Sequence, residues 1–210
     1  MASNAKSQNT LVKDAIILFA ITLISGILLG LSYGVTKGPI EKANEKATQE
    51  AYKLVYPDAD KFEEDSAASD KVKDVDSYFN ENGIEGATVS EVLAAKDSSG
   101  KQIGYVISFA ATEGYGGDID LSMGMTNDGE ITGLEVLSCS ETAGLGAKCQ
   151  QSDFKDQFAG IKADEIEYTK DGKTKDNQID AISGATITTK AVTKGVNAAI
   201  KFLKNDIMAG

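Results

Sequence analysis

Apolar and polar positions divide the chain into an N-terminal anchor and a longer soluble part. Residues 15–35, "AIILFAITLISGILLGLSYGV", carry no charge and are long enough to cross the hydrocarbon core of a bilayer as one helix. The following "SYGVTKGP" is a poor cleavage site, which favours an uncleaved anchor over a signal peptide. The pattern predicts an N-terminal tail at 1–14 and a transmembrane helix at 15–35.

Small residues recur on one side of the predicted span. Gly26, Gly30 and Gly34 are four residues apart and give a smooth face where another helix can approach closely. Glycine is also simply frequent in membrane helices. We favour the packing face, which implies protein partners within the lipid. The flanking lysines leave the orientation open, because long domains translocate largely regardless of such charges.

Residues 36–86 are predicted to connect the span to a folded domain. A juxtamembrane helix is expected from near Pro39, which suits a first helical turn, to Pro57. The next stretch, 58–83, is acidic and loosely patterned. It lacks the regular spacing of a calcium loop, so we interpret it as a solvated surface.

From Ala87 onward the apolar positions alternate, as in half-buried strands. Strand-like runs at 87–95, 102–112, 118–126 and 130–138 are separated by short polar or glycine-rich connections. Short connections between successive strands predict a largely antiparallel meander. We therefore expect an α+β fold, with a mainly antiparallel sheet flanked by helices in one domain at 87–206.

The C-terminal third is predicted to supply the helices and one further hairpin. A short amphipathic helix is expected at 152–161, with Ser152 as its N-cap and Phe154 and Phe158 facing the sheet. Residues 166–175 are expected to form a hairpin. The closing helix, at 190–204, has an apolar stripe that comprises Ala191, Val192, Val196, Ala199, Phe202 and Leu203.

Composition excludes several classes of function. The net charge is −11, and no cluster of basic residues exists that could neutralise phosphates, so a nucleic-acid partner is not expected. Without histidine there is no Ser-His-Asp triad and no histidine metal site, and two cysteines are too few for a four-cysteine cluster. Redox chemistry would need an organic cofactor or neighbouring subunits.

Three loops rich in small residues are candidates for the walls of one site. They are "EGYGGDI" at 113–119, "SETAGLGAK" at 140–148 and "DAISGATITT" at 180–189. None has the spacing of a P-loop or a dinucleotide fingerprint. The third loop directly precedes a helix, whose free N–H groups and dipole would favour a phosphate.

The third loop also resembles a known modification motif. "DAISGAT", residues 180–186, is similar to the flavinylation motif of FMN-binding domains, in which the final threonine is esterified to the phosphate of FMN. The single span, Tyr56-Pro57, "GYGG" and "ETAGLG" occur in the order typical of the G subunit of the Rnf complex. The related C subunit of the sodium-pumping NADH:quinone reductase shares the domain. One departure is Ala143, which stands where the family usually has proline.

The resemblance implies a role and a set of site residues. It implies an electron-carrying subunit of a membrane-bound, ion-translocating ferredoxin:NAD oxidoreductase, with one covalent FMN on the extracytoplasmic side of the cell membrane. Thr186 would carry the phosphoester, made by a separate flavin transferase that recognises the turn before it. The other expected flavin-site residues are Asp180, Ser183, Gly184, Ala185, Thr188, Thr189, Glu141, Thr142, Leu145, Gly146, Tyr115, Gly116 and Gly117.

Alternatives remain open at this stage. Thr186 could simply cap the helix, Thr188 and Thr189 could be caps or phosphate donors, and Tyr115 could be an ordinary half-buried aromatic residue. The chain could be a stand-alone membrane-anchored extracellular flavoprotein, or a flavin-free membrane-tethered scaffold. Cys139 and Cys149 flank the "ETAGLG" loop and could form a disulfide or remain two thiols.

Overall fold

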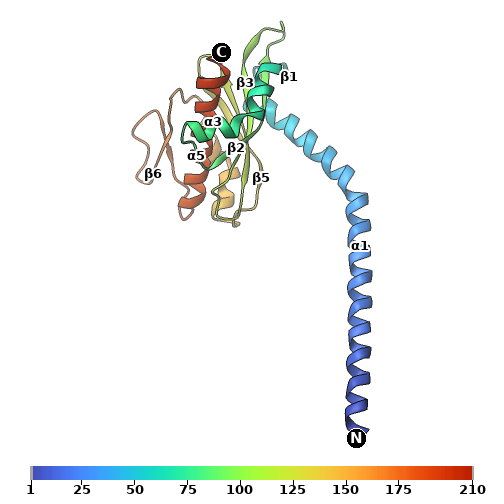
Figure 1. Ribbon diagram of the computed structural model, residues 1–210. Helices are drawn as coiled ribbons and strands as arrows, with labels where there is room; N and C mark the ends of the chain where they lie inside the picture. Colours follow the sequence, from blue (N-terminus) through green and yellow to red (C-terminus); the bar gives the residue numbers. More distant parts are fainter. Residues whose placement is uncertain (1, 210) are drawn as a thin grey trace. The chain divides into compact units, whose positions relative to one another are not determined.

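The computed structural model describes residues 2–209, and it describes side chains for 13–39 and 46–209 (Figure 1). The chain divides into two compact units, residues 1–47 and residues 48–210. Each unit is described by itself below.

The first unit is made by a single long helix, α1 (Ala2–Val55), whose last turns belong to the second unit. Residues Lys13–Pro39 of α1 are long and apolar enough to cross a membrane, and none of the side chains in their most apolar window is buried. A Cβ added at Gly26, Gly30 or Gly34 would meet nothing within 4 Å, so the glycine face is open within the described chain.

The expected start of a new helix near Pro39 is wrong. Pro39 lies inside α1, which continues to Val55. Proline removes only its own N–H from the hydrogen-bond ladder, and the flanking turns continue the helix around it. The predicted end is confirmed, because α1 stops two residues before Pro57, where the residue preceding a proline disfavours helical geometry.

The second unit is built on a five-stranded antiparallel sheet. Each strand pairs with the next in sequence, which confirms the predicted meander. An extra edge strand lies in the acidic stretch, so the compact unit begins at Thr48, upstream of the expected boundary at Ala87. The strands are β1 (Lys61–Glu64), β2 (Ala87–Lys96), β3 (Gln102–Ala111), β4 (Ile119–Thr126) and β5 (Ile131–Cys139).

Helices cover one face of this sheet. The long helix α5 runs along β2 and β3, and its predicted apolar stripe is buried (Figure 1). The acidic stretch also forms helices, the first of which starts where Asp65 Oδ1 accepts from the N–H of Ala67 at 2.9 Å. The helices are α2 (Ser66–Lys73), α3 (Val75–Glu81), α4 (Ser152–Lys155), α5 (Thr186–Phe202), the 3-10 helix η1 (Gly146–Gln150) and the π-helical turn η2 (Leu203–Ile207).

Two local expectations need correction. The helix expected at 152–161 is only the short α4, and its N-cap is Gln151 with no side-chain cap, although Phe154 and Phe158 are buried with ring centroids 5.6 Å apart. The expected hairpin at 166–175 is absent from the described chain. Instead β6 (Glu167–Thr169) pairs in parallel with β7 (Gln178–Asp180), because the polar segment 170–177 is long enough to return the chain to the start of β6.

The other face of the sheet receives the last turn of α1. Tyr52, Val55 and Tyr56 are almost completely buried there. The approach requires glycine in the strands, because a Cβ at Gly133 would lie 2.9 Å from Val55 Cα, and a Cβ at Gly104 would lie 2.7 Å from the Tyr56 hydroxyl. Both faces of the sheet are therefore covered, which leaves its loop end to form a site.

Candidate functional site

Helix α5 begins at Thr186, directly after a tight turn. The N–H of Ala185 donates to the carbonyl of Ile182 at 3.0 Å, and Gly184 has φ +79, which an L side chain rarely adopts. The N-cap residue is Ala185, which offers no side-chain cap. The first N–H groups of the helix, at Thr186 and the next two residues, therefore point out of its start without intrahelical acceptors.

The three threonines of the first helical turn have different surroundings. Thr188 Oγ1 donates to Glu141 Oε2 at 2.9 Å. Thr189 Oγ1 accepts from the N–H of Ile182 at 3.0 Å and donates to the carbonyl of Ala185 at 3.0 Å. Within the described residues, the hydroxyl of half-buried Thr186 has no hydrogen-bond partner. Thr186 is therefore not the N-cap of α5, and its hydroxyl is not engaged by the described part of the chain.

Glu141 brings the three small-residue loops together. Its carboxylate is 8% exposed and accepts from two different loops: the N–H of Gly116 donates to Oε1 at 3.1 Å and Thr188 donates to Oε2. Glu141 itself belongs to the loop after β5. The three loops that were expected to form the walls of one site therefore lie side by side.

Glycine allows the close approach around this carboxylate. A Cβ at Gly146 would collide with Glu141 and would lie 2.5 Å from Thr188 Oγ1, while a Cβ at Gly114 would lie 2.9 Å from Glu141 Oε1. Leu145 reaches the turn before α5, since its Cδ2 is 3.3 Å from the position of a Cβ on Gly184. The loop after β5 therefore contacts both the start of α5 and the loop between β3 and β4.

Apolar side chains from all three loops are exposed near this junction. Tyr115 is 71% exposed, Leu145 46% and Ile187 54%. The interpretation of Tyr115 as a half-buried residue is therefore wrong. Thr142 and Gly117 are also exposed, and Gly117 has φ +121. Exposed apolar groups beside polar backbone groups are what a flat aromatic ligand needs.

Asp180 and Ser183 lie on the outer side of the turn. Gln157 Oε1 accepts from the N–H of Asp180 at 2.7 Å and so fixes the end of β7. Asp180 Oδ1 is buried and has no partner in the described chain. Asp180 and Ser183 both line a cavity of about 440 Å³ together with Lys148 of η1. The sequence analysis did not single out Gln157 or Lys148.

An ion pair holds the loop between β3 and β4 against α5. The ammonium of Lys194 contacts the carboxylate of Glu113, and Glu85 lies 3.8 Å away from the same ammonium. The hydrogen bond from Lys194 keeps the pKa of Glu113 below its usual value. This contact ties the first loop to the same helix that carries Thr186.

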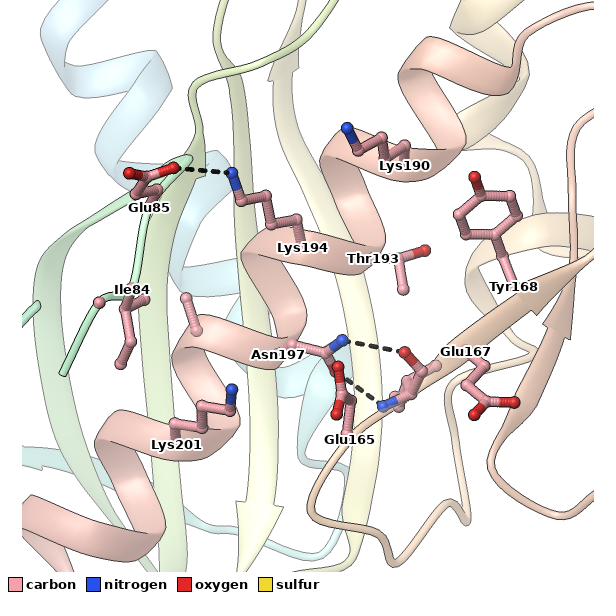
Figure 2. Close-up of a pocket in the computed structure, with 13 residues that line it drawn as sticks. Ile84, Glu85, Glu165, Glu167, Tyr168, Lys190, Thr193, Lys194, Asn197 and Lys201 are labelled. Atoms are coloured by element: carbon pink, nitrogen blue, oxygen red, sulfur yellow. Dashed lines mark hydrogen bonds and ion pairs between the residues drawn. The ribbon is translucent and has the colours of Figure 1, made fainter.

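A separate pocket of about 520 Å³ runs along α5 (Figure 2). Figure 2 shows Lys190, Lys194 and Lys201 on α5, with Glu85 next to Lys194 on one side of the helix and Glu167 and Tyr168 of the β6 segment on the other. The side-chain amide of Asn197, which lines this pocket, is already hydrogen-bonded within the protein. Its oxygen accepts from the N–H of Ile166, and its nitrogen donates to the carbonyl of Ile166. None of the fourteen expected flavin-site residues lines this pocket.

Comparisons with known proteins identify the family of the chain. Residues 114–201 match the FMN-binding domain family. The chain is 39% identical to the G subunit of the Na(+)-translocating ferredoxin:NAD(+) oxidoreductase complex of Acetobacterium woodii, over 92% of this chain and 91% of that protein. It is 33% identical to the proton-translocating counterpart of Clostridium ljungdahlii, over 90% and 93%.

A solved structure shows the same fold. The C subunit of the Na(+)-translocating NADH-quinone reductase from Parabacteroides distasonis aligns with a TM-score of 0.50 and 20% identity, over 79% of this chain and 96% of that one. The likeness concerns the antiparallel sheet and its flanking helices.

The residues at the junction fit an FMN. A free hydroxyl at a helix N-terminus suits a phosphate group, and the exposed Tyr115, Leu145 and Ile187 suit a planar ring. In the described part of the chain, no group of three or more acidic or cysteine side chains could hold a metal ion.

Proposed function

Because the chain belongs to the family of G subunits of ion-translocating ferredoxin:NAD(+) oxidoreductase complexes, we propose that it is the electron-carrying subunit of such a complex and holds one FMN through a phosphoester on Thr186. FMN supplies one- and two-electron redox chemistry, and the protein supplies attachment, orientation and polarity. The other membrane and redox subunits of the complex are its partners.

The proposal rests on a difference in hydrogen bonding among the three threonine hydroxyls at the start of α5. Thr188 and Thr189 donate their hydroxyl hydrogens within the protein, whereas Thr186 has no partner in the described chain. An ester on Thr186 would leave its phosphate beside the free N–H groups and the positive end of a 17-residue helix. This environment explains how a chain without arginine can hold a phosphate.

The remaining loop residues would position and cover the cofactor. Glu141 holds the loops that carry Gly116, Leu145 and Thr188 in one arrangement, and the exposed Tyr115 and Leu145 would exclude water from an apolar ring. Gly144 and Gly117 leave open space, since a Cβ at either position would meet nothing within 4 Å.

We further propose that a separate flavin transferase attaches the FMN. Neither a P-loop nor a dinucleotide fingerprint is present in the sequence to bind a flavin nucleotide for self-modification. Ser183 and Gly184 are exposed directly before Thr186, so a second enzyme can reach the turn without unfolding α5.

The membrane arrangement is also a proposal. Residues 13–39 would cross the lipid bilayer of the cell membrane once, with the second unit on the extracytoplasmic side. A covalent link would keep the cofactor from being lost to dilution there. Protease added to right-side-out vesicles should digest the second unit, whereas digestion only in inverted vesicles would place that unit in the cytoplasm.

The direct test compares wild type with Thr186→Val, which keeps the shape of the side chain but lacks the hydroxyl. Membranes that also contain a flavin transferase should give a fluorescent band at the size of this chain on a denaturing gel, and Thr186→Val should abolish it. Thr88→Val, at an exposed position on β2, is the matched control and should keep the band. The assembled complex with Thr186→Val should lose ferredoxin:NAD(+) electron transfer, and unchanged activity would contradict the proposal.

A further inference from the structure

The chain contains only two cysteines, and the fold brings them together. Cys139 is the last residue of β5 and Cys149 lies in η1, with their Sγ atoms 3.6 Å apart. Both are free thiols in this structure. We propose that Cys139 and Cys149 are a redox-active dithiol that closes to an intrachain disulfide around the Glu141 loop. The proposal is independent of the flavin.

The geometry needs little change to form the bond. A disulfide has a sulfur–sulfur distance near 2.05 Å, so the two sulfurs have to approach by about 1.5 Å. Side-chain rotation and a small shift of the loop can supply this movement. The backbone between the cysteines already folds back on itself, because the N–H groups of Leu145 and Ala147 both donate to the carbonyl of Thr142, at 3.1 and 3.2 Å.

The two thiols differ in access, which sets the order of the steps. Cys149 has no exposed surface, whereas Cys139 is half-buried. Burial raises the pKa of the Cys149 thiol well above its usual value, with the adjacent Cys139 and the charge of Glu141 adding to the effect. A thiolate is the attacking species in disulfide exchange. Cys139 is therefore the thiol that an external oxidant meets first.

The reaction consumes one small disulfide, such as oxidised glutathione. The Cys139 thiol loses its proton, and its sulfur attacks the small disulfide, breaking that S–S bond and releasing one small thiol. The Cys149 sulfur then displaces the second small thiol from the mixed disulfide, and its own proton leaves. Two protein thiols are oxidised by two electrons and one small disulfide is reduced to two thiols, so the exchange balances.

The bond would close the segment that organises the loop junction. Residues 140–148 contain Glu141, Leu145 and Gly146, and these contact Gly116, Gly184 and Thr188. With both ends joined, this segment could not separate from β5 without breaking a covalent bond. The bond would thus restrict the movement of the segment whose Glu141 contacts the other two loops.

The sequence permits an unambiguous peptide test. No lysine or arginine occurs between residues 102 and 147, and Lys148 directly precedes Cys149. Trypsin therefore separates the two cysteines into peptides 102–148 and 149–155. The full-length protein in detergent should be treated with oxidised glutathione, unfolded in the presence of a maleimide and digested without reductant. We expect peptides 102–148 and 149–155 joined by a disulfide and no maleimide on either, and two labelled cysteines when reductant precedes labelling.

A variant that lacks the accessible thiol provides the control. In Cys139→Ser, Cys149 should be recovered as a free, maleimide-labelled thiol, because its sulfur is inaccessible to the oxidant in the folded protein. Labelling of both wild-type cysteines after oxidation would overturn the proposal, as would a stable glutathione adduct on Cys139 with Cys149 free. Circular dichroism of Cys139→Ser should match that of the reduced wild type, which shows that the variant is folded.

Discussion

At the scale of single residues, one carboxylate connects the parts of the site. Glu141 is buried, and its two oxygens accept from the backbone of one loop and from a side chain of α5. From the sequence, Glu141 is expected to line the flavin. The structure adds that it joins the loops on which the other expected residues lie.

Replacing Glu141 should therefore loosen the site and destabilise the fold. Glu141→Ala removes the acceptor of two hydrogen bonds and leaves the Thr188 hydroxyl buried without a partner, which should cost about 1.5–3 kcal/mol in the free energy of unfolding. Glu141→Gln keeps one acceptor oxygen and the side-chain volume, so its loss should be smaller. Urea unfolding of the three proteins measures both values, and equal stability of Glu141→Ala and wild type would show that the carboxylate has no such role.

The sequence could identify Thr186 as a candidate but not its chemical state. Four hydroxyls stand within residues 183–189, and the motif singles out Thr186 by resemblance alone. Which hydroxyls are engaged depends on contacts with Glu141, far away in the chain, and on the turn closed by Ile182 and Ala185. Such long-range hydrogen bonds leave no local pattern in the sequence.

At the scale of elements, the last turn of α1 packs against three strands through glycines. Thr132 donates its hydroxyl to the carbonyl of Val55, and Gly133 lies against the backbone of that residue. Gly133→Val should push this turn off the sheet and cost about 1–3 kcal/mol, as overpacking usually does. Ser138→Val, at an exposed position of the same strand, should change stability little. Thermal unfolding compares the two variants, and an unchanged Gly133→Val would contradict the close contact.

The last turn of α1 should also make the free energy of unfolding depend on pH in the alkaline range. Burial raises the pKa values of Tyr52 and Tyr56 to about 12, with the hydrogen bond to Glu91 adding to the first and the charge of Asp58 to the second. Folded tyrosines thus keep protons that the unfolded chain loses near pH 10. The contribution of these two phenols to stability should be constant below pH 10 and fall between pH 10 and 12, by up to about 1.4 kcal/mol per pH unit for each phenol.

Urea unfolding from pH 8 to 12 tests this slope. Tyr56→Phe should make the decline between pH 10 and 12 less steep, because one perturbed phenol is gone. A wild-type stability that does not change up to pH 12 would show that neither phenol is held in its neutral form by the fold.

The elements themselves were largely predictable where the apolar pattern was regular. Strands β2 to β5 and the buried stripe of α5 follow from periods of two and of about three and a half residues. The pattern failed where pairing is non-local. Strand β1 is short and acidic, and β6 and β7 are three-residue strands whose parallel pairing depends on the path of the polar segment between them.

At the scale of the whole molecule, the second unit should fold without the preceding helix. A chain that begins at Thr48 retains every strand and both apolar clusters of the sheet. A chain that begins at Ala87 loses β1 and the buried Tyr52, Tyr56, Val75 and Phe79. At about 1.5–3 kcal/mol for each large buried side chain, this loss is comparable with the total stability of a domain. We expect a cooperative unfolding transition for the first chain and none for the second, and heat-capacity scans distinguish them.

If Thr186 carries the cofactor, the mass of a single tryptic peptide must show it. Trypsin releases residues 176–190 as a single peptide that contains Ser183 and all three threonines of the first turn of α5. Mass spectrometry of protein from native membranes should find this peptide heavier by one FMN less one water, with the added mass located on Thr186 by fragmentation. An unmodified peptide, or the added mass on Ser183, Thr188 or Thr189, would contradict the claim.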